Sequence, residues 1–180
     1  MKYFLNLSFL VVLSAIFLIS CSDDDDDESN EITNSYFKVA ESEYSLKGGT
    51  LVYQENLGEI NGVFFSSMSL MLHSEGIEVI ETEVQGEGFG IYLNLLSLEK
   101  GELASGEYKF GEDQGFVSQI SEGEYEDVGG TLSGQITSGA ITVEKKGDNY
   151  EITLDLVNEK GQEITGYYNG KLTYYDDVNN

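Results

Sequence analysis

The amino-acid sequence predicts an all-β fold, a single antiparallel β-domain of about 8–11 strands that is barrel-like or a β-sandwich. Apolar and polar residues alternate with a period of two along many short segments, as in strands with one buried face. Glycine, Asn and Asp interrupt these segments, as they do at tight turns. No stretch of ten or more residues in the body follows the 3.6-residue period of an amphipathic helix.

The first segment has the features of a secretory signal peptide. Met1 and Lys2 precede an uncharged, apolar run from Tyr3 to Ile19. A transmembrane helix needs about 20 apolar residues and a flank that stays at the interface. Here the run ends at the small residues Ser20 and Cys21. We predict a lipoprotein signal peptide over residues 1–20.

Cys21 is the only cysteine of the chain. Leu18-Ile19-Ser20-Cys21 resembles the lipobox of bacterial lipoproteins. The resemblance implies that the Cys21 thiol carries diacylglycerol, that cleavage precedes it and that its new amine is acylated. Two or three acyl chains would hold the protein on a membrane, since each buried methylene contributes about 0.8 kcal/mol. The alternative is an ordinary buried or reactive cysteine.

A dense acidic run follows Cys21. Its residues are Ser22, Asp23, Asp24, Asp25, Asp26, Asp27 and Glu28. Such like charges repel and extend the chain, so we expect a disordered tether over residues 21–34. The run also resembles the surface-export signal of Bacteroidetes lipoproteins, which implies an outer-membrane, cell-surface location and contact with the lipoprotein processing and export machinery. The alternative is a solvated spacer.

The remaining residues, 35–180, are expected to form the all-β domain. Short strands are predicted in the first part of this region, and the span 122–138 is left open as either one more strand or a long loop. The predicted strands are Tyr36–Val39, Glu43–Leu46, Thr50–Glu55, Gly62–His73, Gly76–Glu81, Gly88–Leu98, Gly106–Phe110 and Phe116–Ile120. The segment Gly86-Glu87-Gly88-Phe89-Gly90 is interpreted as a turn and bulge before a strand. Apolar residues on both sides of the strand around Ile91 indicate that both faces are covered.

The last third predicts a three-stranded antiparallel meander. Its strands are Gly139–Lys145, Tyr150–Val157 and Glu163–Tyr175. Gly147-Asp148 and Lys160-Gly161 supply residues that tolerate the positive φ of hairpin turns. Gly166 and Gly170 permit curvature and the close approach of another backbone, which favours a barrel over a flatter sandwich.

Tyrosines in the last predicted strand offer a possible ligand contact. Successive side chains of a strand point to opposite faces, so Tyr168 and Tyr174 should join the core. Tyr167 and Tyr175 should then point outward. An outward tyrosine can stack on a sugar ring or pack in a protein interface, or it can simply cover the sheet.

The body also resembles small uncharacterised surface-exposed lipoproteins of Bacteroidetes. The resemblance lies in strand and turn segments such as Tyr44–Leu51, Gly106–Phe110, Ser138–Val143 and Asn149–Leu156, followed by the glycine-rich strand from Gly161. It implies an all-β fold and a surface lipoprotein, and it transfers no catalytic residue.

Charge excludes one class of partner. Seven of the 33 acidic residues precede residue 35 and Lys2 lies in the leader, so the body carries 26 acids against eight lysines, a net charge of −18. A phosphate backbone would be repelled by such a surface, so we expect no nucleic acid partner.

The sequence offers no catalytic constellation, so we predict a non-enzyme without a cofactor. His73 is the only histidine, and neither a Gly-x-Ser-x-Gly elbow nor a cysteine nucleophile accompanies it. No metal ligands are assigned, and calcium binding by loop oxygens stays open. The predicted function is non-catalytic binding of a glycan or protein partner. The alternatives are a lipocalin-like carrier of a small apolar ligand and, more distantly, a carbohydrate-active enzyme with paired carboxylates.

Overall fold

The computed structural model describes residues 34–60, 63–80, 83–97, 102–111, 119–130 and 132–176. The chain divides into two compact units, Met1–Ile32 and Thr33–Asn180. The second unit contains every described strand and its own hydrophobic core. We therefore expect it to fold independently as one domain. Cys21, Ser22, the acidic run and the predicted signal peptide lie outside the described residues.

The described residues contain thirteen strands and no helix, which confirms the all-β prediction. Consequently, none of them belongs to a helix that could cross a membrane. The strands are β1 (Tyr36–Val39), β2 (Ser42–Ser45), β3 (Gly48–Ile60), β4 (Val63–His73), β5 (Ile77–Ile80), β6 (Glu83–Gly86), β7 (Gly88–Ser97), β8 (Gly106–Phe110), β9 (Gln119–Val128), β10 (Ser133–Lys146), β11 (Asn149–Asn158), β12 (Glu163–Gly170) and β13 (Leu172–Asp176).

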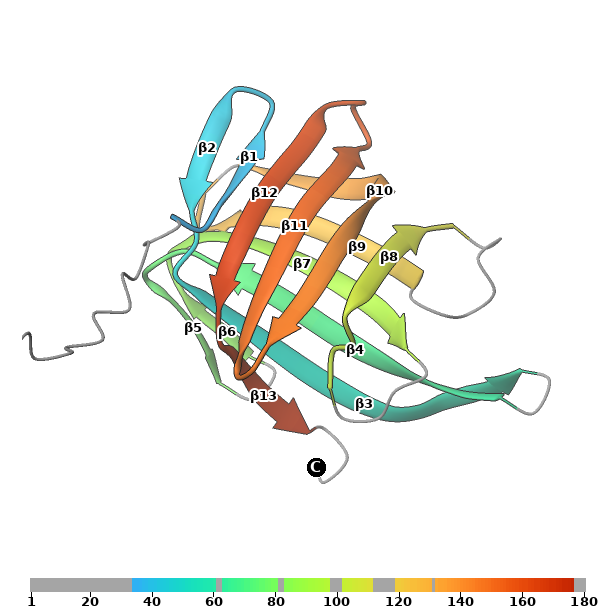
Figure 1. Cartoon of the computed structure of the whole chain (residues 1–180). Helices are drawn as coiled ribbons and strands as arrows, with labels where there is room; N and C mark the ends of the chain where they lie inside the picture. The colour runs from blue at the N-terminus through green and yellow to red at the C-terminus, as the bar shows by residue number, and fades with distance from the viewer. Residues whose placement is uncertain are drawn as a thin grey trace, which may run out of the picture. The chain divides into compact units, whose positions relative to one another are not determined.

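Eleven strands form one continuous curled sheet in the order β13-β3-β4-β7-β9-β8-β10-β11-β12-β1-β2. The sheet bends into a half-barrel, and β5 and β6 form a separate two-stranded sheet (Figure 1). The barrel-like alternative is therefore the observed one. The expectation that all strands pair antiparallel was wrong at two places. β13 pairs with β3 in parallel, and β8 pairs with β9 in parallel.

The predicted meander is present as β10, β11 and β12, and its two turns have Gly147 and Gly161 at φ of 63° and 73°. Its last strand, however, ends at Gly170. The chain then turns at Lys171 and continues as β13, which joins the opposite edge of the sheet beside β3. This crossing draws the two sides of the sheet together.

The span left open as a strand or a loop belongs to β9 and β10. Residues 119–128 and 133–146 are strands whose ends pair with each other, Tyr125 lying opposite Gly134. Of the strand predicted at Phe116–Ile120, the described part opens β9. The sequence reading missed β6, because only Val84 among its four residues is a large apolar side chain.

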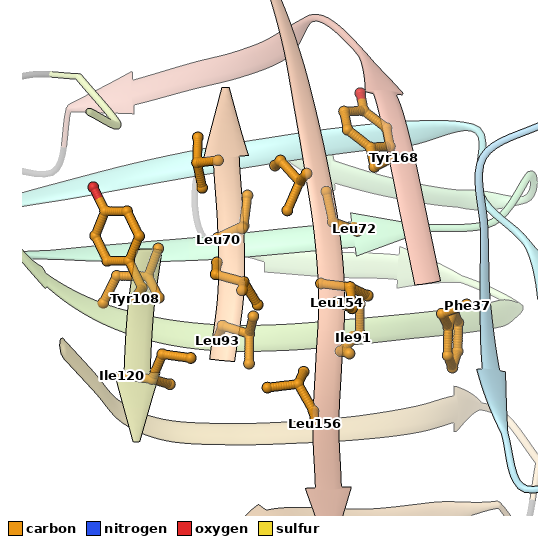
Figure 2. Close-up of a cluster of buried hydrophobic side chains, with 14 of the residues drawn as sticks. Phe37, Leu70, Leu72, Ile91, Leu93, Tyr108, Ile120, Leu154, Leu156 and Tyr168 are labelled. Carbon is orange, nitrogen blue, oxygen red and sulfur yellow. The ribbon is translucent and has the colours of Figure 1, made fainter. Parts of the chain in front are cut away.

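The concave side of the sheet is filled by large apolar side chains. Leu70, Ile91 and Leu156 are each at most 1% exposed. Figure 2 shows side chains of β4 and β7 meeting those of β11 across this interior. Fully burying one leucine or isoleucine side chain contributes about 1.5–3 kcal/mol. The hydrophobic effect in this interior therefore holds the curled sheet together without a disulfide.

Gly166 lets two strands approach closely, as the sequence predicted. A Cβ atom at this position would lie 2.7 Å from the Tyr36 carbonyl oxygen of β1 and 2.8 Å from Leu154 Cδ1 of β11. Only a residue without a side chain fits between these neighbours.

Tyr168 stabilises the turn between β12 and β13. It is 3% exposed, and its hydroxyl donates a hydrogen bond of 2.7 Å to the Lys171 carbonyl oxygen. Burial raises the pKa of Tyr168 to about 12. Because the folded protein favours the neutral phenol, the unfolded chain loses this proton at a lower pH.

We expect the free energy of unfolding to fall by on the order of 2 kcal/mol as pH rises from 10 to 12. The contribution of Tyr168 is fully present below pH 10. Tyr168→Phe should cost about 1 kcal/mol at pH 8 through the lost hydrogen bond, yet it cannot ionise. Urea denaturation of both proteins from pH 8 to 11.5 should therefore show a difference that shrinks and then reverses in sign. Parallel stability curves would contradict this role of the phenol.

Candidate functional site

The β5–β6 hairpin covers part of the outer face, which we define as the side of β3, β4 and β7 opposite the core. Figure 1 shows this hairpin lying beside β3 and β4, apart from the large sheet. Val79 and Val84 pair with each other within the hairpin and line a pocket together with outer-face residues. We call the β5–β6 hairpin the roof hairpin.

Strand register places the floor of this pocket in two rows. Thr50, Met71 and Tyr92 lie opposite one another across β3, β4 and β7. Val52 and Ser69 form the next row. All five alternate along their strands with core residues, so they point to the outer face.

The outer-face pocket has a volume of about 150 Å³. It is mainly apolar, and the described residues of its lining include no charged side chain. The lining residues are Thr50, Val52, Gln54, Ser69, Met71, Val79, Val84 and Tyr92. Thr50, Val52 and Met71 are buried at 3%, 7% and 8% exposure, so the hairpin shields the floor from solvent.

The floor carries the hydroxyl of Thr50 and a pair of hydroxyls from Ser69 and Tyr92. Ser69 Oγ and Tyr92 Oη lie 2.8 Å apart in a hydrogen bond that either can donate. Two hydroxyls that share one bond keep a second donor and several acceptor lone pairs. The pair can therefore hydrogen-bond a polar group of a guest.

Glycines and a serine set the position of the roof hairpin. The predicted turn and bulge at Gly86–Gly90 is the connection from β6 into β7, and Gly86 adopts a φ of 102°. A Cβ at Gly86 would collide with the carbonyl oxygen of Gly76, which precedes β5 at the same end of the hairpin. Ser74 Oγ accepts a hydrogen bond of 2.9 Å from the Phe89 amide and ties this end of the hairpin to β7.

Tyr175 lies beside this pocket, while Tyr167 does not. The Tyr175 hydroxyl donates a hydrogen bond of 3.1 Å to the Val79 carbonyl oxygen, so β13 supports the roof hairpin from the side. Tyr167 is half-buried on β12, where it pairs with Tyr36 and Thr153. The two predicted contact residues are thus on strands that lie at opposite sides of the sheet.

The position predicted for the Tyr174 side chain was wrong. It was expected in the core, but it is 43% exposed. The strand that pairs with β11 ends before Lys171. β13 therefore does not lie beside β11 but at the edge of the sheet against β3.

Sequence reasoning did not single out the pocket residues. The available signal was the apolar character of both faces of β7, where Tyr92 and Leu96 alternate with the core residues. That signal predicted a cover over the strand. The pattern did not indicate that β5 and β6 provide this cover, because the placement of a hairpin depends on tertiary packing.

A second, more open hollow lies between the ends of β9 and β10. It has a volume of about 440 Å³, and Glu124, Glu126 and Glu159 line it together with Tyr125 and Gln135. Gln135 Nε2 donates a hydrogen bond of 3.0 Å to Glu124 Oε2. The acidic lining disfavours an anionic guest.

The described part of the chain brings together no three His, Cys, Asp or Glu side chains in a geometry for a metal ion. His73 closes β4, where its Nδ1 lies 3.1 Å from the Ser74 carbonyl oxygen. That oxygen can only accept, so the bond requires the His73 proton on Nδ1.

Comparison of the chain with protein-family models, with curated proteins and with solved structures finds no match. Its function must therefore be argued from its own residues.

Proposed function

We propose that this chain is a lipid-anchored lipoprotein of the bacterial outer surface and that its β domain binds a partner without catalysis. The observation that carries the binding role is the outer-face pocket. It is shielded, mainly apolar and supplied with a few hydroxyls, which is the usual make-up of a ligand site. The leader, Cys21 and the acidic run from Ser22 to Glu28 support the anchor and the surface location.

The two alternative functions receive less support from the same geometry. A lipocalin-like carrier needs an internal cavity of about 300 Å³ or more, whereas large apolar side chains fill the concave side of this sheet. A glycoside hydrolase needs two carboxylates that face each other across a cleft. No carboxylate is among the described residues that line the outer-face pocket. Three glutamates line the open hollow between β9 and β10, where Glu124 accepts a hydrogen bond from Gln135.

The location is tested by protease treatment of intact cells that express the full chain. We expect cleavage within residues 21–34 to release the β domain into the medium. In Cys21→Ser the anchor should be lost, and exchange of Asp23–Asp27 for serines should leave the protein anchored but protected. Wild-type protein that stays protected until the cells are lysed would contradict the surface location.

The binding role is tested with protein recovered from the same cells. Small molecules extracted from wild type are compared by mass spectrometry with those from Val79→Phe, whose larger side chain should fill the outer-face pocket from the roof hairpin. Ile80→Phe is the matched control, since Ile80 is 50% exposed on the same hairpin. We expect a species bound to wild type and to Ile80→Phe that Val79→Phe lacks. Identical extracts from all three proteins would contradict a ligand in this pocket.

A further inference from the structure

We propose that the outer-face pocket takes one uncharged aromatic ring that carries a hydrogen-bonding substituent, a compound of the phenol class. This inference rests on the binding role proposed above and specifies its ligand. Three properties of the pocket lead to it: its volume, the arrangement of apolar and hydroxyl groups, and the absence of charge from its lining.

The volume limits the guest to a single ring. Sites for drug-sized ligands measure about 300–1,000 Å³, so a pocket of about 150 Å³ is too small for them. A cavity of about 150 Å³ suffices for benzene. A second fused ring, an acyl chain or a disaccharide would extend beyond this volume into solvent.

The apolar lining lies on opposite sides of the guest. Val79 and Val84 approach from the roof hairpin, while Met71 belongs to the floor. This arrangement offers two apolar surfaces to the faces of a flat ring. A methionine sulfur makes favourable contacts with an aromatic ring.

The hydroxyl pair of Ser69 and Tyr92 calls for a polar substituent on the ring. The pair lines a space that is otherwise mainly apolar apart from Thr50 and Gln54. A phenolic hydroxyl can accept from one member of the pair or donate to it. A pyranose is a worse fit, because most of its hydroxyls would lose water against Val52, Val79 and Val84 without a partner.

Charge excludes acids from the pocket. None of the described side chains that line the pocket is cationic, so a buried carboxylate would lack a counter-ion there. The surrounding domain carries a net charge of −18, which further repels anions. Phenol should therefore bind, whereas 4-hydroxybenzoate should not.

The test uses the unit Thr33–Asn180, which contains the whole core, in a titration followed by methyl NMR. The probes are phenol, 4-hydroxybenzoate and methyl glucoside, each up to 20 mM, and toluene up to its limit of solubility in water. We expect phenol to shift the methyl resonances of Val52, Met71, Val79 and Val84 through its ring current. Toluene has no hydroxyl and is the reference for the variants that remove the hydroxyl pair.

Variants separate this site from non-specific binding. Val79→Phe should abolish the phenol shifts, while Ile80→Phe on the solvent side of the same hairpin should preserve them. The double variant Ser69→Ala, Tyr92→Phe should weaken phenol about tenfold and leave toluene unchanged. Because it keeps the apolar lining, this variant isolates the hydroxyl pair.

Three outcomes would overturn the inference. They are the absence of phenol shifts at 20 mM, binding of methyl glucoside in preference to phenol, and phenol binding that survives Val79→Phe. If phenol fails but the cell extract still yields a species that Val79→Phe lacks, the ring is wrong and the binding role stands. If both experiments fail, the binding role falls as well.

Discussion

Replacing Asn158 by alanine is expected to lower the free energy of unfolding by about 3 kcal/mol. Asn158 is 1% exposed at the end of β11, and its side chain makes four hydrogen bonds. Its Nδ2 donates to Tyr125 Oη and to Gln162 Oε1, each at 2.9 Å. Its Oδ1 accepts from the amides of Lys160 and Gln162, at 3.0 and 2.9 Å.

The size of the effect follows from what alanine leaves behind. Tyr125 is 2% exposed, so its hydroxyl would lose a buried partner in a place that bulk water hardly reaches. The turn from β11 to β12 would also lose the two bonds that shape it. Urea denaturation with an unchanged slope should report the loss.

Asn149→Ala provides the matched control. Asn149 is the same residue type at the opposite end of β11, but it is exposed. Its replacement should change stability by less than about 0.5 kcal/mol. Equal losses at the two positions would contradict the importance of the Asn158 hydrogen bonds.

A second large effect is expected for Gly139→Ala, which should cost more than about 3 kcal/mol. Gly139 has a φ of 108° and follows the register shift between Ile136 and Ser138 in the pairing of β10 with β11. A Cβ there would lie 2.6 Å from Leu156 Cα and would also meet the Asp155 carbonyl oxygen. Both are backbone atoms of β11, so β10 and β11 would have to separate.

Gly147→Ala separates backbone strain from this collision. Gly147 also has a positive φ, 63°, yet no atom lies within 4 Å of a Cβ built there. Its replacement should cost about 1 kcal/mol. Thermal unfolding followed by circular dichroism measures both variants, and a similar loss for each would mean that the contact with β11 does not matter.

The sequence predicted most of the strands, because each depends on local information. Alternation along β11 places Ile152, Leu154 and Leu156 on one face, and glycine with Asp or Lys marks the two turns beside it. The packed face of β7 could likewise be read from Ile91 and Leu93. Period two and turn chemistry are properties of neighbouring residues, so they are visible without the fold.

The candidate site depends on contacts between distant segments, which is why the sequence did not reveal it. Tyr175 appeared as an outward side chain, but its hydrogen bond to Val79 joins residues 96 positions apart. The last predicted strand also looked continuous. The chain turns at Lys171 because β13 pairs with β3, and this pairing is visible only in the folded structure.

The parallel pairing of β13 with β3 has a consequence for how this domain acquires its structure. Leu172 lies opposite Gly49, so the pairing joins segments separated by more than 120 residues. Contacts of such long range form slowly, because the entropy of closing the loop is lost before the pairing compensates for it. A nascent chain cannot make this contact until residues 172–176 have emerged. Until β13 docks, the outer edge of β3 has no strand beside it, so this edge of the sheet is completed last.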